Sequence, residues 1–260
     1  MILNAPWMPV LVTVLGLVMG SAVTAIAHRV PRGLSWVRGR SACPSCGHVL
    51  TVIDLVPVLS WASTGGRCRY CRVRVPWRYP LTELACGTWA LLLWRVTGPT
   101  WAYLPLALWG FLLVALFWID LDYQLLPDVL TFPGTLLGIA AALTLPAGGW
   151  HAILGMALGS GLLGLLAWGY ERIRKVEGMG GGDIKLAAMF GAVLGWQLTL
   201  LTLALAALAG TLWGALLIAR HRGTGMTALP FGTLLAPAAM IAFLWGAGWL
   251  NAYMRMIRSL

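Results

Sequence analysis

Long apolar stretches separated by short polar segments recur along the whole chain. Eight of them approach the roughly 20 residues that an α-helix needs to cross a bilayer. They cover residues 7–27, 81–96, 101–121, 129–145, 151–170, 184–198, 200–219 and 231–250. The second, fourth and sixth are short, and the sixth and seventh form one broken hydrophobic run, so seven or nine spans are the alternatives. The pattern predicts an all-α polytopic membrane protein with about eight transmembrane helices.

Composition supports this class. The chain is 60% hydrophobic and only 10% charged, whereas soluble globular proteins carry about 25% charged residues. A net charge of +10 is a feature of nucleic-acid-binding proteins. Here, however, the basic residues lie in segments next to the apolar stretches, where topology and anionic lipid headgroups account for them. We therefore expect membrane lipids as partners and no nucleic acid.

The basic residues also predict an orientation. With eight spans, 15 of the 18 Lys and Arg residues fall on one side, in residues 29–78, 172–185 and 220–222. Short cytoplasmic loops carry the excess of basic residues, so these segments are predicted to be cytoplasmic and the N-terminus periplasmic. The first apolar stretch has no basic segment before it and no small-residue cleavage site after it, so we expect it to be retained.

The segment between the first two spans carries four of the five cysteines. They form two CxxC pairs, Cys43/Cys46 and Cys68/Cys71, separated by 21 residues. Two such turns supply four thiolates to one tetrahedral zinc ion with no open position, which is typical of a structural site. Redox pairs or two disulfides are the alternatives, but structural disulfides rarely persist in a reducing cytoplasm. His48 is a spare ligand, and Cys86 lies within a span and is expected to be a packing residue.

This segment is too short to bury a large core, so a metal ion would stabilise it. We divide the chain into a first transmembrane helix (residues 1–28), a cytoplasmic zinc-binding loop (29–80) and a transmembrane core (81–260).

Acidic residues are few and gather toward the cytoplasmic side. There are eight: Asp54, Glu83, Asp120, Asp122, Asp128, Glu171, Glu177 and Asp183. A carboxylate in or beside a membrane span is costly and is a functional candidate by default. Asp120 lies deepest at the end of the third span, and Asp183 follows the glycine-rich residues 178–182 at the start of the sixth.

Two carboxyl groups in one partly dry site cannot both ionise comfortably, so one keeps its proton while the other acts as a base. This arrangement predicts an aspartyl protease, and the residues leave open which aspartate is the base. The alternative is that Asp183 caps a helix and Asp120 merely ends one. Asp122 points about 200° away from Asp120 on a helix, and Asp128 follows Pro127 like a helix-start residue. The glycine-rich run lacks the Lys-Ser/Thr ending of a P-loop.

Together these residues resemble the bacterial type IV prepilin peptidase family (leader peptidase/N-methyltransferase), which are GxGD-type membrane aspartyl proteases. The resemblance is carried by four segments: Cys43 to Cys71 with Asp54-Leu-Val-Pro57 between the pairs, Arg78-Tyr79-Pro80 to Glu83, Ile119-Asp120 to Asp128, and Gly180-Gly181-Gly182-Asp183-Ile184-Lys185. It spans nearly the whole chain in order.

The resemblance implies a bacterial inner-membrane enzyme that cleaves type IV prepilins and type II secretion pseudopilins after the glycine that ends a short basic leader. Asp120 and Asp183 would be catalytic, with Gly180, Gly182, Lys185 and Asp128 supporting them. The substrate's hydrophobic N-terminal helix would enter between the spans, and Asp122, Asp128 and Glu177 would attract its leader.

The family also implies N-methylation of the new N-terminal residue with S-adenosylmethionine as methyl donor. Where the family reads Gly-Ser-Phe-Leu-Asn, this chain has Gly20-Ser21-Ala22-Val23-Thr24, so a peptidase without methyltransferase activity is the alternative. Glu83 and His28 are the candidate residues for methyl transfer, against the simpler interpretation that they face the membrane interface or pair with arginines.

Three other functional classes remain as alternatives. A proton-coupled transporter would use membrane aspartates as a relay, but its charges would lie near the bilayer midplane. A zinc-ribbon scaffold would recruit secretion machinery without chemistry. A zinc-dependent hydrolase would lose activity at once on chelation.

Overall fold

A computed structural model describes residues 5–36, 38–144, 148–175, 180–220 and 230–259. Within them every regular element is a helix. The only strand-like pairings are two isolated bridges in the loop of residues 29–80, which we call the cysteine loop. In chain order the elements are α1 (Met8–Arg29), η2 (Val30–Arg32), η3 (Ile53–Leu55), α2 (Leu59–Ser63), α3 (Arg78–Thr97), α4 (Tyr103–Tyr123), α5 (Asp128–Thr144), α6 (Gly148–Arg174), α7 (Gly181–Ala219), α8 (Phe231–Ile241), η4 (Ala242–Gly246) and α9 (Ala247–Arg258).

The prediction of an all-α polytopic membrane protein is confirmed at this level. Five helical segments among the described residues are long and apolar enough to cross a membrane: Met8–Arg32, Tyr103–Tyr123, Gly148–Arg174, Gly181–Ala219 and Phe231–Arg258. Helix α5 is apolar but shorter, with 17 residues. Helix α3 has 20 residues, but its first turns are more polar.

Helix α7 is a hairpin of two antiparallel helices. Gly195 interrupts it with φ 68° and ψ 178°, a conformation that is essentially open to glycine alone. A Cβ built on Gly159 of α6 would lie 3.0 Å from both the Ala187 carbonyl and the Thr199 side chain. In a straight helix those two residues would be about 18 Å apart, so the chain turns back on itself.

The sequence predicted this break between residues 198 and 200, and that position is wrong by a few residues. Hydrophobicity locates a continuous apolar run and carries no information on φ. The reversal occurs where a glycine permits it, at Gly195, and Thr199 is already in the returning helix.

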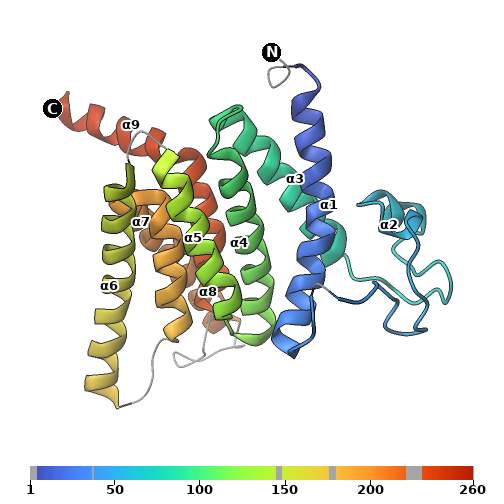
Figure 1. The fold of residues 1–260 in the computed structure, drawn as a ribbon. Coiled ribbons are helices and arrows are strands. Elements are labelled where there is room, and N and C mark those ends of the chain that lie inside the picture. The colour runs from blue at the N-terminus through green and yellow to red at the C-terminus, as the bar shows by residue number, and fades with distance from the viewer. Residues whose placement is uncertain (1–4, 37, 145–147, 176–179, 221–229, 260) are drawn as a thin grey trace.

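Helix α4 occupies the centre of the bundle and packs against α1, α3, α5 and α8 (Figure 1). Of its most apolar 18-residue stretch, 61% is buried, which is more than in any other candidate membrane span among the described residues. Trp89 of α3, Trp109 of α4 and Phe243 of η4 form an aromatic cluster with ring centroids 5.7–6.2 Å apart. The Trp109 indole N–H donates to the Met189 carbonyl of α7 at 3.2 Å, so the core has a fixed register across four elements.

Glycines bring several helices into backbone contact. On α1, a Cβ at Gly16 would lie 2.7 Å from the Cys86 carbonyl, and one at Gly20 would collide with the Glu83 Cα. On α6, Gly155 lies against the Gly191 backbone of α7 in the same way. Membrane helices associate through small residues at such interfaces because lipid tails remove the hydrophobic driving force.

The cysteine loop lies beside the α1 and α3 pair, on the opposite side of the bundle from α6 (Figure 1). It contains η3, α2 and the isolated bridges Ala42–Val49 and Arg67–Arg74. Its only buried hydrophobic residues among those described are Cys43 and Cys68. The loop therefore has no apolar core of its own.

Candidate active site

The two aspartates proposed as catalytic lie at the same end of the bundle. Helix α4 ends there, and α5, α7 and α8 begin there, at the lower end of the bundle in Figure 1. Asp120 lies in the last turn of α4. Asp183 is the third residue of α7.

Asp120 is buried, with 4% of its surface exposed. Its Oδ2 accepts two hydrogen bonds from Thr233 of α8, one from the backbone N–H at 2.6 Å and one from the hydroxyl at 2.9 Å. A Cβ on the preceding residue, Gly232, would lie 3.0 Å from the Asp120 Cγ. The absence of a side chain at Gly232 is what lets α8 approach the carboxylate.

Asp183 reaches the same place through a chain of close contacts. A Cβ on Gly182 would lie 2.8 Å from the Leu126 Cβ, and one on Gly232 would lie 3.0 Å from the Leu126 Cδ1. Leu126 is thus wedged between the starts of α7 and α8. Asp183 lies close enough to Asp120 for their charges to interact. Its Oδ1 is buried and has no hydrogen-bond partner among the described residues.

The predicted supporting residues differ in what they do. Lys185 Nζ donates to Asp128 Oδ1 at 2.6 Å, which ties the start of α7 to the start of α5. Gly182 requires the absence of a side chain because of Leu126. Gly180 has φ −69°, and the nearest atom to a Cβ there would be the Gly182 N at 4.0 Å, so the described residues show no steric need for glycine at that position.

Asp122 faces away from Asp120, as the helical spacing predicts. It pairs with Arg78 of α3 at 2.9 Å, and the Arg78 guanidinium also lies over the Trp118 ring, 5.1 Å from its centroid. Of the three acids expected to attract a basic leader, Asp122 and Asp128 already have cationic partners, and Glu177 lies outside the described residues.

The four loop cysteines come together as the sequence predicts. One sulfur from each lies within 4.8 Å of the other three, and Cys43 Sγ and Cys71 Sγ are 3.8 Å apart. Zinc–sulfur bonds of about 2.3 Å in a tetrahedron place neighbouring sulfurs about 3.8 Å apart, so the donor set fits a zinc ion. A hydrogen bond from the Cys46 backbone lowers the pKa of Cys43 to about 7, which favours the metal-binding thiolate.

The two CxxC turns have the same backbone design. The Cys43 N–H donates to His48 and the Cys68 N–H donates to Val73, while the Cys43 and Cys68 carbonyls accept from Gly47 and Arg72. Gly47 has φ 70° and its counterpart Arg72 has φ 61°. The second turn therefore places an arginine in a left-handed conformation that usually favours glycine.

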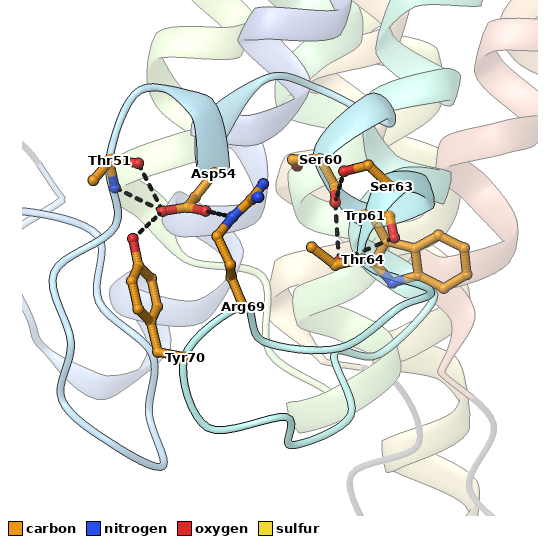
Figure 2. A network of polar contacts seen from close by, with 8 residues as sticks. All are labelled: Thr51, Asp54, Ser60, Trp61, Ser63, Thr64, Arg69 and Tyr70. Carbon is orange, nitrogen blue, oxygen red and sulfur yellow. Dashed lines mark hydrogen bonds and ion pairs between the residues drawn. The ribbon is translucent and has the colours of Figure 1, made fainter.

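Asp54 holds the middle of the loop to the second cysteine turn (Figure 2). Its carboxylate accepts from the Thr51 N–H at 3.0 Å, the Thr51 hydroxyl at 2.8 Å, Arg69 Nε at 2.9 Å and the Tyr70 hydroxyl at 2.9 Å. Burial alone would raise the pKa of Asp54, but these four donors outweigh it and hold that pKa well below its usual range. From the sequence alone, no role could be assigned to Asp54.

The two candidates for methyl transfer have different surroundings. Glu83 is 8% exposed, and its Oε2 accepts from the Val58 N–H at 2.7 Å. This bond joins α3 to the start of α2, where Val58 has the unusual φ of 61°; no ion pair with arginine is formed within the described part of the chain. His28 is exposed near the end of α1. Residues 20–24 of α1 are the segment in which this chain differs from the family pattern. There Val23 and Thr24 are buried, and the Thr24 hydroxyl donates to the Gly20 carbonyl.

Comparisons with known proteins agree with this architecture. The profile described as "Bacterial Peptidase A24 N-terminal domain" matches residues 14–96, and that of the "Type IV leader peptidase family" matches residues 106–215. A prepilin leader peptidase/N-methyltransferase of Aeromonas salmonicida is 40% identical over 210 residues, which cover 80% of this chain and 72% of that protein. The chain belongs to the type IV leader peptidase family.

Other members of the family match over nearly their full length. A prepilin leader peptidase/N-methyltransferase of Pseudomonas aeruginosa is 36% identical, with 89% of this chain and 88% of that protein covered. The protein of the same name from Aeromonas hydrophila is also 36% identical, with 93% and 92% covered. No solved structure matches. The first profile includes all four cysteines of the loop and the second includes both aspartates, whereas Thr233 lies beyond both.

Proposed function

We propose that this multi-pass inner-membrane protein is a prepilin leader peptidase that uses Asp120 and Asp183 as its catalytic pair. It cleaves type IV prepilins and type II secretion pseudopilins after the leader glycine and then N-methylates the new N-terminal residue. The observation that carries the proposal is the convergence of Asp120 and Asp183 around Leu126 at one end of the bundle. The names of relatives 36–40% identical over most of their length supply the substrate class.

The chemistry follows from two carboxyl groups that share one proton. The ionised carboxylate takes a proton from water as its oxygen attacks the scissile carbonyl carbon, and the protonated carboxyl gives its proton to the carbonyl oxygen. When the tetrahedral intermediate collapses, the carbon–nitrogen bond breaks and the leaving amine receives a proton. Burial of Asp120 and of the Asp183 Oδ1 limits competition from bulk water.

We place eight spans in the membrane, with the N-terminus periplasmic and the catalytic end of the bundle cytoplasmic. The hairpin of α7 supplies the sixth and seventh spans, and α3 and α5 supply the second and fourth. The same end carries Arg78 and Lys185, as expected for a cytoplasmic face. The three parts of the chain are the first helix (1–28), the zinc loop (29–80) and the core (81–260).

We assign a structural zinc ion to Cys43, Cys46, Cys68 and Cys71, because their four sulfurs lie within 4.8 Å of one another and four thiolates leave no position for substrate. When bound, the ion stabilises the loop and takes no part in hydrolysis. The loop is joined to α3 by the Glu83–Val58 hydrogen bond.

S-adenosylmethionine is the methyl donor that the relatives' names imply. Glu83 already accepts a backbone N–H and His28 is exposed, so their surroundings in the described part of the chain do not mark a donor site. Mass spectrometry of the mature substrate separates the two activities. Cleavage with methylation gives an N-terminal residue about 14 Da heavier than cleavage alone, because one methyl group replaces a hydrogen.

An apolar groove offers a place for the substrate's hydrophobic helix. It has a volume of about 310 Å³ and lies between α3, through Leu84 and Thr88, and the α8–η4 segment, through Met240 and Leu244. Helix α8 carries Thr233 of the aspartate site seven residues before Met240, which is about 10 Å along the helix. A substrate helix in this groove would bring its cytoplasmic end to Asp120.

The groove predicts a difference between long and short substrates. Leu84→Trp fills it and should raise the KM for full-length prepilin several-fold while leaving cleavage of a short leader-junction peptide unchanged. Leu165→Trp, at a residue of α6 that is 67% exposed, is the matched control. Equal effects of Leu84→Trp on both substrates would exclude the groove as the docking site.

The proposed catalytic pair is tested by cleavage of a purified prepilin in detergent or liposomes. Asp120→Asn and Asp183→Asn should each lower kcat by about four orders of magnitude, because either change prevents the pair from sharing its proton. Asp122→Asn, which alters a residue that faces Arg78, is the control and should retain most activity. Normal cleavage by either of the first two variants would refute the assignment.

A further inference from the structure

The two aspartates are not equivalent in their hydrogen bonds. Asp120 Oδ2 accepts two, from the Thr233 N–H at 2.6 Å and the Thr233 hydroxyl at 2.9 Å. Asp183 Oδ1 is buried and has no donor among the described residues. Hydrogen bonds to a carboxylate stabilise its charged form, and a buried oxygen without a donor favours the protonated form.

The position of Thr233 adds to this difference. It is the third residue of α8, where backbone N–H groups have no partner within the helix. Pro230 precedes the helix and provides no side-chain cap, so Asp120 of α4 serves as the cap of α8. Asp183 also lies in the first turn of a helix, so the field of a helix end acts on both aspartates. The direct donors are what distinguish them.

From this asymmetry we propose that Asp120 is the ionised member of the pair and the general base, that Asp183 holds the shared proton and is the general acid, and that Thr233 is the positioning residue that sets these roles. The inference rests on the proposed function. In the reaction, Asp120 takes a proton from the attacking water as the new carbon–oxygen bond forms, and Asp183 protonates the carbonyl oxygen. On collapse, Asp120 gives its proton to the leaving amine and Asp183 recovers one from the hydroxyl that becomes the new carboxyl group.

The two acidic residues nearest Asp120 in the sequence, Asp122 and Asp128, are already paired with basic residues. Asp122 of α4 binds Arg78 of α3, and Asp128 of α5 binds Lys185 of α7. Helix α8 contains no titratable residue, and His28 and Arg29 end α1. The charge of Asp120 acts on Asp183, so changes at Thr233 should be felt through this pair.

The first test is the pH dependence of kcat/KM for prepilin cleavage. Thr233→Val keeps the shape and the backbone N–H but removes the hydroxyl, and Thr233→Ser keeps both donors. If Asp120 must be ionised, Thr233→Val should move the acidic limb of the profile to higher pH by about one unit, from the loss of one hydrogen bond to a charged group. Thr233→Ser should restore the wild-type profile.

Thr199→Val is the matched control, because Thr199 is fully buried and its hydroxyl has no hydrogen-bond partner among the described residues. It should leave both limbs in place. A Thr233→Val profile that moves at the basic limb, or at neither limb, would assign the ionised role elsewhere and overturn the inference.

A second measurement needs no activity and no change at Thr233. Infrared difference spectra follow the C=O stretch of a protonated carboxyl group as pH is varied. In Asp183→Asn the remaining Asp120 should ionise at lower pH than the remaining Asp183 does in Asp120→Asn; the reverse order would overturn the inference. Normal cleavage by either Asn variant would instead refute the proposed catalytic pair, so the two failures can be told apart.

Discussion

The cysteine loop and the aspartate site are built in opposite ways. The loop has almost no buried apolar residues, and its shape depends on four thiols and on the four hydrogen bonds that Asp54 accepts. The aspartate site has few polar contacts and depends on close helix packing at Gly182 and Gly232. The loop is therefore expected to respond to metal and acid, and the catalytic end to added side-chain volume.

Among changes that leave both aspartates in place, the largest effect on activity is expected from added volume at Gly232. Gly232→Val places a side chain where a Cβ would already lie 3.0 Å from the Asp120 Cγ, so the carboxylate or α8 must move. Misplacement of a catalytic group by about 1 Å costs about 100-fold in rate, and we expect a loss of that size in kcat. Gly161→Val in α6, where a Cβ would have nothing within 4 Å, should retain activity; equal losses in both would indicate a general folding defect.

Loss of the metal should affect the loop more than the catalytic end. Cys43→Ser, or prolonged chelation, removes one or all zinc ligands, and limited proteolysis within residues 38–77 should accelerate by about tenfold or more. Activity should decline slowly as the loop unfolds. Cys86→Ser, at a buried cysteine of α3, is the control for losing a thiol. Immediate loss of cleavage that metal restores within mixing time would instead indicate catalysis by zinc.

A smaller effect is expected where the cysteine loop meets α3. Glu83→Ala removes the acceptor of the Val58 N–H, so hydrogen exchange at the Val58 amide should be about tenfold faster. Glu171→Ala, at an exposed residue of α6, should leave that amide unchanged. If Val58 exchanges equally slowly in Glu83→Ala, the loop is held to α3 by other contacts.

The smallest effect concerns acid and Asp54. Its pKa is lowered in the folded loop, so its contribution to stability is complete above the ordinary aspartate pKa of about 3.9 and is lost as pH falls toward the folded-state value. The wild-type loop should resist pepsin better than the Asp54→Asn loop near pH 4, and this advantage should shrink as the pH falls further. The comparison at matched pH cancels protonation of the zinc thiolates. Parallel curves for the two proteins would contradict this role of Asp54.

Most of the fold could be predicted from sequence, because a bilayer requires long apolar helices. The cysteine cluster and the two aspartate motifs were equally visible, since each is a local pattern of residue types. The position of the break in α7 was not, because the apolar run continues through Gly195 and only the backbone conformation marks the reversal.

The partners of these motifs could not be predicted in the same way. Thr233 lies 113 residues from Asp120, within an apolar stretch that reads as an ordinary span. Asp54 likewise finds Arg69 and Tyr70 only after the loop has folded. Both depend on contacts between distant segments, and a single sequence records the residues without recording their proximity.

The turn at Gly195 has a consequence for how far the chain can reach. If α7 continued straight, Ala219 would lie about 54 Å from Asp183 along the helix axis, and the bilayer core is only about 30 Å thick. The 12 steps from Ala219 to Phe231 span at most about 42 Å when fully extended. The first turn of α8 could then not return to Asp120, so a single glycine makes the Asp120–Thr233 contact geometrically possible.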